Sequence, residues 1–355
     1  MFITSIGGDN PVKWETLEKS IRDECKLHRK SSSYTEKYLE YAKNLYEKGL
    51  PLISSPEHLS LLIGIDHQYV CNMAYASDKF YRHFTIKKAN GKSRGIYEPL
   101  PDLKYVQHWI LTNILEKCQV SDYAKAYVKK RTLKHNARFH KAQRVVVTMD
   151  IKDFFPTIRL FDVFTIFKEM GYFENVAWFL AHLCCRKKVL PQGAPTSPYL
   201  SNIRMMKLDK AIVNYTAVEK IRYTRYADDL TFSGDFNPHK LIPAVSKLVY
   251  QDGFQVNNEK TRVAYQNARQ EITGIVVNSY MQVSKEQRKR IRQQVYYIKK
   301  YGLDSHLEHI GEERTNYLNH LLGQINFALF VNPEDSELKS AFETIKELMR
   351  ENRKG

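Results

Sequence analysis

Apolar and polar side chains alternate along Ile221–Gly234, where the sequence is IRYTRYADDLTFSG. Alternation with a period of two predicts strands with one buried face, and the central Ala-Asp-Asp predicts a hairpin whose tip carries Asp228 and Asp229. Upstream, the β-branched run Val145–Val147 predicts a buried strand that ends at Asp150. The pattern therefore predicts three carboxylates at strand ends.

Helical patterns and one further hairpin are predicted in other parts of the chain. Helices are predicted over 14–48, 59–76 (a short pair), 101–117, 284–300, 313–331 and 337–350. Asn90-Gly91 is a strong turn signal between two β-patterned flanks, so a hairpin is predicted over 81–99. The sequence thus predicts an α+β protein.

Three carboxylates near one another would repel, and a counter-charge is needed. Mg²⁺ suits such a group because it prefers carboxylate and phosphate oxygens. Two simpler interpretations stay open at this point. The Asp228-Asp229 pair is also compatible with a polar turn, and Asp150 with a strand-end cap.

Four segments, in this order, resemble the sequence boxes of reverse transcriptases. They are Asp150 with Phe154-Phe155-Pro156, Leu190–Pro198 (LPQGAPTSP), Tyr226-Ala227-Asp228-Asp229, and Val256–Thr261 (VNNEKT). The third matches the YxDD box of that family. The resemblance extends roughly over 59–330 and leaves the first fifty residues outside it.

Two shorter elements make the chain similar to the bacterial retron enzymes within that family. Asn136-Ala137-Arg138-Phe139-His140 matches an Asn-Ala-x-x-His element that precedes the first carboxylate box. Ile272-Thr273-Gly274 corresponds to a Val-Thr-Gly element after the catalytic hairpin, with isoleucine in place of valine. Both elements favour a retron enzyme over an intron-encoded or diversity-generating one.

The resemblance implies an α+β right-hand polymerase with fingers, palm and thumb. The expected division is an N-terminal helical extension over 1–56, fingers over 57–143, a palm over 144–278 with part of the fingers interleaved, and a helical thumb with the C-terminal helix over 279–355. No RNase H domain is expected after the thumb.

The resemblance also assigns roles to the carboxylates and to the substrate-side residues. Asp150, Asp228 and Asp229 are expected to be catalytic and to hold two Mg²⁺ ions about 4 Å apart, with Mn²⁺ as a substitute. Expected substrate-binding residues are Lys87 and Arg94 for the triphosphate, Phe155 under the incoming sugar, and Gln192 and Gly193 beside the nascent base pair. Solvated surface cations, a core phenylalanine and a simple turn are the respective alternatives.

RNA contacts are expected at two places. Asn136 and His140 belong to the retron-specific element, and a predicted thumb helix carries a basic face. That face consists of Lys285, Arg288, Lys289 and Arg292, opposite an apolar stripe of Ile291, Val295 and Ile298. A solvated basic face is the alternative interpretation.

Composition agrees with a nucleic-acid partner. The chain of 355 residues has a formal net charge of +16, so a polyanionic partner is expected. Its five cysteines show no CxxC spacing, which suits a reducing cytosol. No apolar run approaches the ~20 residues needed to span a bilayer, so a cytoplasmic protein without membrane contact is expected.

The expected function is RNA-directed DNA synthesis from dNTPs. The resemblance to retrons implies a dedicated structured non-coding RNA as template and primer, a guanosine 2′-hydroxyl as the starting point, and a branched RNA–DNA product. It also implies an anti-phage defence complex with an effector protein. The alternatives are an abortive-infection or intron-type reverse transcriptase, and a non-catalytic RNA-binding scaffold.

Overall fold

The structure is a computed structural model that describes residues 13–87, 91, 93–312, 314 and 316–351. It contains both helices and strands, as the α+β prediction requires. Among the described residues, no helix is both long and apolar enough to cross a membrane. The five cysteines carry free thiols.

The chain divides into two compact units, each assembled from separated stretches of sequence. Unit 1 comprises Met1–Val128, Ile151–Val213 and Val245–Val256, and unit 2 comprises Lys129–Asp150, Asn214–Ala244 and Asn257–Gly355. The units do not follow the domain boundaries expected at 56, 143 and 278, because both units draw on the fingers and palm ranges. Those boundaries therefore stay a prediction.

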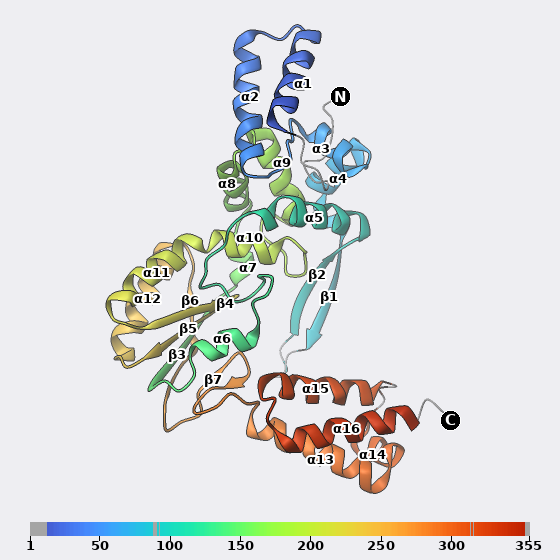
Figure 1. Cartoon of the computed structure of the whole chain (residues 1–355), viewed down its shortest axis with the longest axis vertical. Helices are drawn as coiled ribbons and strands as arrows, with labels where there is room; N and C mark the ends of the chain where they lie inside the picture. The colour runs from blue at the N-terminus through green and yellow to red at the C-terminus, as the bar shows by residue number, and fades with distance from the viewer. Residues whose placement is uncertain (1–12, 88–90, 92, 313, 315, 352–355) are drawn as a thin grey trace. The chain divides into compact units, whose positions relative to one another are not determined.

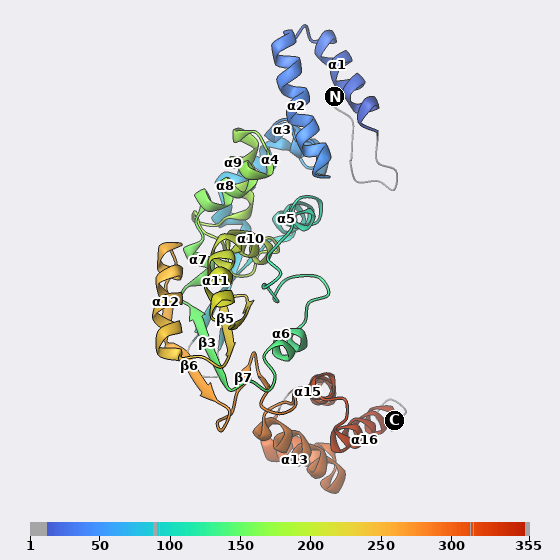
Figure 2. The ribbon, with the colours of Figure 1, turned by 60° about the vertical axis from the view of Figure 1, so that its left-hand side comes forward.

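Helices make up most of unit 1. They are α1 (Trp14–Leu27), α2 (Ser32–Glu47), α3 (Pro56–Ile63), α4 (His67–Tyr75), η1 (Ser77–Phe80), α5 (Pro101–Asn113), η2 (Leu115–Lys117), α7 (Phe154–Thr157), α8 (Leu160–Met170), α9 (Glu174–Cys184) and α10 (Ser197–Arg204). Helices α1 and α2 lie side by side (Figure 2). Aromatic packing fixes α2 on the segment after α8, since the rings of Tyr41 and Phe173 stack 3.7 Å apart.

A two-stranded hairpin in unit 1 confirms the one predicted over 81–99. Strands β1 (Tyr81–Lys87) and β2 (Ser93–Pro99) are antiparallel, with Ile86 opposite Arg94 and Lys87 opposite Ser93 (Figure 1). Most side chains of β1 are exposed, so the ribbon is held mainly by its backbone ladder.

A four-stranded sheet positions the carboxylates. Its strands run in the order β4 (Arg222–Tyr226), β5 (Asp229–Gly234), β3 (Val145–Ile151) and β6 (Val256–Tyr265). Six of the seven residues of β3 are buried, which explains its continuous apolar run. Helices α11 (Met206–Val218) and α12 (Pro238–Gln251) each include residues of both units.

Unit 2 also holds α6 (Leu133–Phe139), the small strands β7 (Glu271–Ile272) and β8 (Ile275–Val276), and the C-terminal helices. The latter are α13 (Lys285–Tyr301), α14 (Leu303–Ile310), α15 (Tyr317–Val331) and α16 (Ser336–Glu351). The sequence prediction missed α14, and it placed the start of α15 at 313, which lies outside the described residues.

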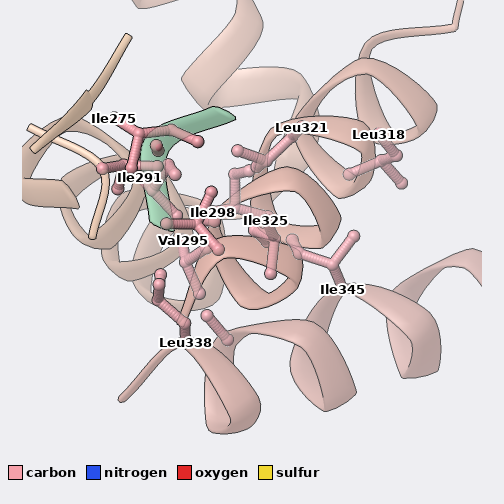
Figure 3. Packing of buried hydrophobic residues seen from close by; sticks show 14 of the residues in the cluster. Ile275, Ile291, Val295, Ile298, Leu318, Leu321, Ile325, Leu338 and Ile345 are labelled. Carbon is pink, nitrogen blue, oxygen red and sulfur yellow. The ribbon is translucent and has the colours of Figure 1, made fainter. Parts of the chain in front are cut away.

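One hydrophobic cluster joins the C-terminal helices. Figure 3 shows Ile291, Val295 and Ile298 of α13 packed with Leu321 and Ile325 of α15. The apolar stripe predicted for α13 is therefore confirmed, because all three of its residues are buried. Leu338 and Ile345 bring α16 into the same cluster.

Candidate active site

A tight turn between β4 and β5 carries the first two carboxylates. Tyr226 lies opposite Asp229, so Ala227 and Asp228 form the tip of the hairpin. Ala227 has a φ of 58°, a left-handed conformation that a residue with a Cβ rarely adopts. The buried guanidinium of Arg225 donates a hydrogen bond to the Ala227 carbonyl at 3.2 Å. Sequence reasoning gave Arg225 no role, yet it stabilises a strained turn.

Strand register places the third carboxylate beside this turn. Asp150 lies directly opposite Asp229 across the antiparallel pair β3–β5. Opposed residues in such a pair have their Cβ atoms about 4.5–5.5 Å apart. Asp150 is 8% exposed, and Asp228 and Asp229 are partly exposed. The predicted carboxylate group is therefore assembled within unit 2.

The surroundings of Asp229 raise its proton affinity. Burial, together with the charges of Asp228 and Asp150, raises the pKa of Asp229 to about 6. The ammonium of Lys260 opposes this rise, and its Nζ lies 2.7 Å from Oδ1 of Asp150. The hydrogen bond to Asp150 in turn raises the pKa of Lys260. The group carries more negative than positive charge at neutral pH and favours a cation.

The donor set suits a hard divalent cation. All three acids offer carboxylate oxygens, the ligands that Mg²⁺ prefers. Within the part of the chain that the structure describes, no three acidic, histidine or cysteine side chains are already arranged to hold one ion. Asp150 instead contacts Lys260. A metal ion at this turn would therefore compete with the ammonium of Lys260 for the carboxylate of Asp150.

Unit 1 brings three of the predicted substrate residues together. The loop at Gln192 lies against β2: the Tyr97 amide donates to the Gln192 carbonyl at 2.8 Å, and Nε of Arg94 donates to its side-chain oxygen at 2.9 Å. Gly193 has a φ of 123°, and a Cβ there would lie 2.7 Å from the Tyr97 carbonyl oxygen. Only glycine fits this close approach.

The register separates Lys87 from Arg94. Successive side chains of a strand point to opposite faces, and Arg94 is opposite Ile86 while Lys87 is opposite Ser93. Arg94 and Ile96 share the face that meets the Gln192 loop, so Lys87 lies on the other face. The register therefore does not support the prediction that both cations grip one triphosphate.

Comparison with known proteins decides the family. Residues 86–299 match the reverse transcriptase (RNA-dependent DNA polymerase) family. The chain is 32% identical over 268 residues to the Retron Ec86 reverse transcriptase of Escherichia coli, which covers 74% of this chain and 83% of that protein. This chain belongs to the retron reverse transcriptases. Like other reverse transcriptases, it is an RNA-dependent DNA polymerase that uses an RNA template, dNTPs and a divalent metal.

A second relative extends the match. The Retron Mx65 reverse transcriptase of Myxococcus xanthus is 31% identical over 313 residues, covering 81% of this chain and 71% of that protein. Among solved structures, the chain is similar to telomerase from Candida albicans, with a TM-score of 0.45 and 10% sequence identity. The match covers 75% of this chain and 61% of the telomerase chain. That likeness is too distant to add to the retron assignment.

Phe155 follows the first carboxylate of this retron enzyme by five residues. It lies in the short helix α7, where its ring is partly buried and 6.4 Å from the ring of Tyr127. The neighbouring Phe154 is almost fully buried and contacts Phe254. Phe154 is thus the core residue of the pair, which leaves Phe155 available for substrate contact.

The retron-specific Asn136 and His140 are fully buried. Thr224 donates its hydroxyl hydrogen to Oδ1 of Asn136 at 2.6 Å, so Nε2 of His140 must donate to Thr224 at 2.7 Å. A neutral ring that donates at Nε2 accepts at Nδ1, here from Ser233 at 2.7 Å. Side chains with 0% exposure cannot contact RNA, so the prediction of direct contact is wrong for both. They instead fix α6 on the catalytic hairpin.

The basic face of α13 divides into two kinds of residue. Arg288 donates to Asp335 at 3.1 Å and to Glu337 at 2.8 Å, and Arg292 also pairs with Glu337. These two arginines tie α13 to α16, so the predicted RNA contact competes with internal ion pairs. Lys285 and Lys289 are exposed, and the described residues include no carboxylate partner for either.

Proposed function

We propose that this retron reverse transcriptase copies a dedicated structured non-coding RNA, and that it starts from a guanosine 2′-hydroxyl of that RNA. The product would be a branched RNA–DNA molecule. The family membership supports the reaction class, and the resemblance of the Asn136–His140 element to retron enzymes supports the priming mode. The observation that best supports catalysis by these carboxylates is the strand register, which sets Asp150 opposite Asp229 and beside the turn at Asp228.

In this proposal Asp150 and Asp228 bind two Mg²⁺ ions, and Asp229 completes the carboxylate set. The ions would activate the attacking hydroxyl and stabilise the leaving pyrophosphate. Lys260 offsets part of the negative charge while the metal is absent, as its contact with Asp150 suggests. Mn²⁺ has similar ligand preferences and would substitute.

The remaining residues would select and hold the nucleotide. Arg94 offers a planar, permanently charged group to the triphosphate. Gln192 and Gly193 would contact the nascent base pair, since their loop is held on β2 by backbone contact. The ring of Phe155 would lie under the sugar and exclude a 2′-hydroxyl, which favours dNTPs over ribonucleotides.

We also propose the division into an N-terminal extension, fingers, palm and thumb at the boundaries expected from the sequence. The resemblance to retrons supports a role in anti-phage defence with an effector protein. A non-catalytic scaffold is the rival function. Burial, together with repulsion from Asp228 and Asp150, raises the pKa of Asp229, and this argues against a scaffold, because a scaffold gains nothing from carboxylates that destabilise its fold.

The test is DNA synthesis by the protein co-expressed with the non-coding RNA encoded beside its gene. We expect dNTP incorporation that needs Mg²⁺ and gives a DNA that stays joined to RNA after denaturation, until a 2′,5′-debranching enzyme releases it. Asp228→Asn should bind the RNA and make no DNA, since a neutral amide replaces a metal ligand. Synthesis by Asp228→Asn at the wild-type rate would refute the catalytic assignment. A linear product would refute the priming mode.

A further inference from the structure

Helix α6 has two faces with different chemistry. Its inward face holds the fully buried Asn136, Ala137 and, just past its end, His140. The α-helical period then directs 135, 138 and 139 to the other side. His135, Arg138 and Phe139 are indeed exposed, with Phe139 at 42%. An exposed phenylalanine between two cationic or titratable side chains is not explained by core packing.

These outward residues line a pocket in unit 2. His135, Arg138 and Phe139 surround a shallow pocket of about 470 Å³, and Arg222 from the start of β4 completes its lining. The volume lies within the range of about 300–1,000 Å³ typical of small-ligand sites. The lining is therefore two arginines, one imidazole and one aromatic ring, without a carboxylate.

The arrangement favours an anion over a neutral ligand. Arg222 donates to the Phe139 carbonyl at 2.9 Å, which covers the negative end of α6 and holds the guanidinium in place. In the described part of the chain, neither Arg138 nor Arg222 has a carboxylate partner, unlike Arg144, which pairs with Asp235 at 2.8 Å. An anion would thus meet two guanidinium groups that are not already neutralised.

We propose that this pocket binds one unpaired nucleotide of the template RNA, with its phosphate on Arg138 and Arg222 and its base stacked on Phe139. The inference rests on the proposed function, since it names where the RNA is held. Guanidinium pairs suit phosphate, and bases stack on exposed aromatic rings in single-strand binding sites. Arg222 and Tyr226 are the ends of one strand, so the nucleotide would lie about 13 Å along β4 from the catalytic turn.

Two variants of the full-length protein test the two contacts. The probe is a fluorescein-labelled single-stranded oligouridine RNA, with a fully paired RNA hairpin as comparison. Arg138→Gln with Arg222→Gln should lower the slope of log affinity against log salt by about 0.7, because one phosphate contact of a single strand is lost. The matched control, Lys240→Gln with Lys339→Gln, removes the same charge from exposed sites elsewhere and should leave the slope unchanged.

Phe139→Ala tests the stacking. It should weaken oligouridine binding about 5- to 150-fold, the range for loss of one stacked base, and leave hairpin binding unchanged. RNA carrying 5-bromouridine should photo-crosslink to Phe139, with the adduct mapped by mass spectrometry. Equal losses for both RNAs, or crosslinks that avoid 135–139 and Arg222, would overturn the proposal.

An independent readout separates this proposal from the proposed function. Wild-type protein should extend a DNA primer annealed to a generic RNA template, because that reaction depends on the carboxylates. If extension occurs and the pocket variants bind oligouridine like the wild type, the pocket inference fails alone. If extension fails in the wild type, the proposed function fails, whatever the pocket binds.

Discussion

Replacing Asp229 with asparagine should stabilise the metal-free protein at pH 8. The carboxylate of Asp229 lies opposite Asp150 and next to Asp228, and burial and these two charges raise its pKa to about 6. Its ionised form is therefore unfavourable in the folded state. Asparagine has the same shape without the charge, so the variant avoids this cost when no metal is present.

The magnitude follows from the pKa shift. A rise from 3.8 to about 6 corresponds to about 3 kcal/mol at 1.36 kcal/mol per unit. Asp229 is partly exposed, and solvent screening reduces this to about 1–2 kcal/mol. Because the folded state binds the proton more tightly than the unfolded state, wild-type stability should fall as the pH rises from about 4 to about 6. Above that window the difference from the variant should be constant.

Urea unfolding followed by circular dichroism, in EDTA, measures this directly. We expect Asp229→Asn to unfold at higher urea than the wild type at pH 8 and at the same urea at pH 4. Saturating Mg²⁺ should reverse the order at pH 8, since ligands stabilise the state that binds them. Asp235→Asn, at an exposed carboxylate paired with Arg144, is the control and should lower stability by at most about 1 kcal/mol. Equal or lower stability of Asp229→Asn in EDTA at pH 8 would refute the reasoning.

Three further outcomes are expected. Phe155→Val should raise ribonucleotide use relative to dNTP use about 10- to 200-fold in steady-state kinetics, and an unchanged ratio would place the ring in the core. Lys260→Met should tighten Mn²⁺ binding, measured by electron paramagnetic resonance, about 1.4- to 5-fold by removing a competing cation; weaker binding would contradict this. Lys285→Gln with Lys289→Gln should weaken RNA binding without changing stability. Arg288→Gln should instead lower the free energy of unfolding by about 1–3 kcal/mol, because it loses its bonds to Asp335 and Glu337. The reverse pattern would refute the assignment of the lysines to RNA and of Arg288 to internal ion pairs.

The sequence predicted the elements that depend on local patterns. The period-two alternation around Asp228 gave both strands of the catalytic hairpin, and Asn90-Gly91 gave the β1–β2 ribbon. The apolar stripe of α13 was also correct. Helix α14 was missed because Gly302 marks the end of α13, and the eight residues that follow are too few for a clear periodic signal.

Contacts between segments far apart in the chain could not be predicted from the sequence. The matches to known boxes gave roles to Asp150 and Gln192. Lys260 lies in the matched segment Val256–Thr261 but received no role, because its ammonium meets Asp150 only when β6 lies next to β3. Spacing suggested a shared role for Lys87 and Arg94, yet strand register turns them to opposite faces. The four cations of α13 are equivalent in the sequence pattern, but in the structure Arg288 is paired with Glu337 of α16.

The Asn-Ala-x-x-His element shows how one short motif can serve two purposes. Its named positions face inward, where Asn136 and His140 satisfy the buried hydroxyls of Thr224 and Ser233. Loss of either side chain would leave buried polar groups unpaired, at about 1–3 kcal/mol each. Its unspecified positions are Arg138 and Phe139, which line the proposed nucleotide pocket. Helix position is thus fixed by residues that RNA never touches, while the RNA-facing residues can change without moving the helix. An exchange of these two residues between retron enzymes should therefore alter RNA preference and preserve the fold.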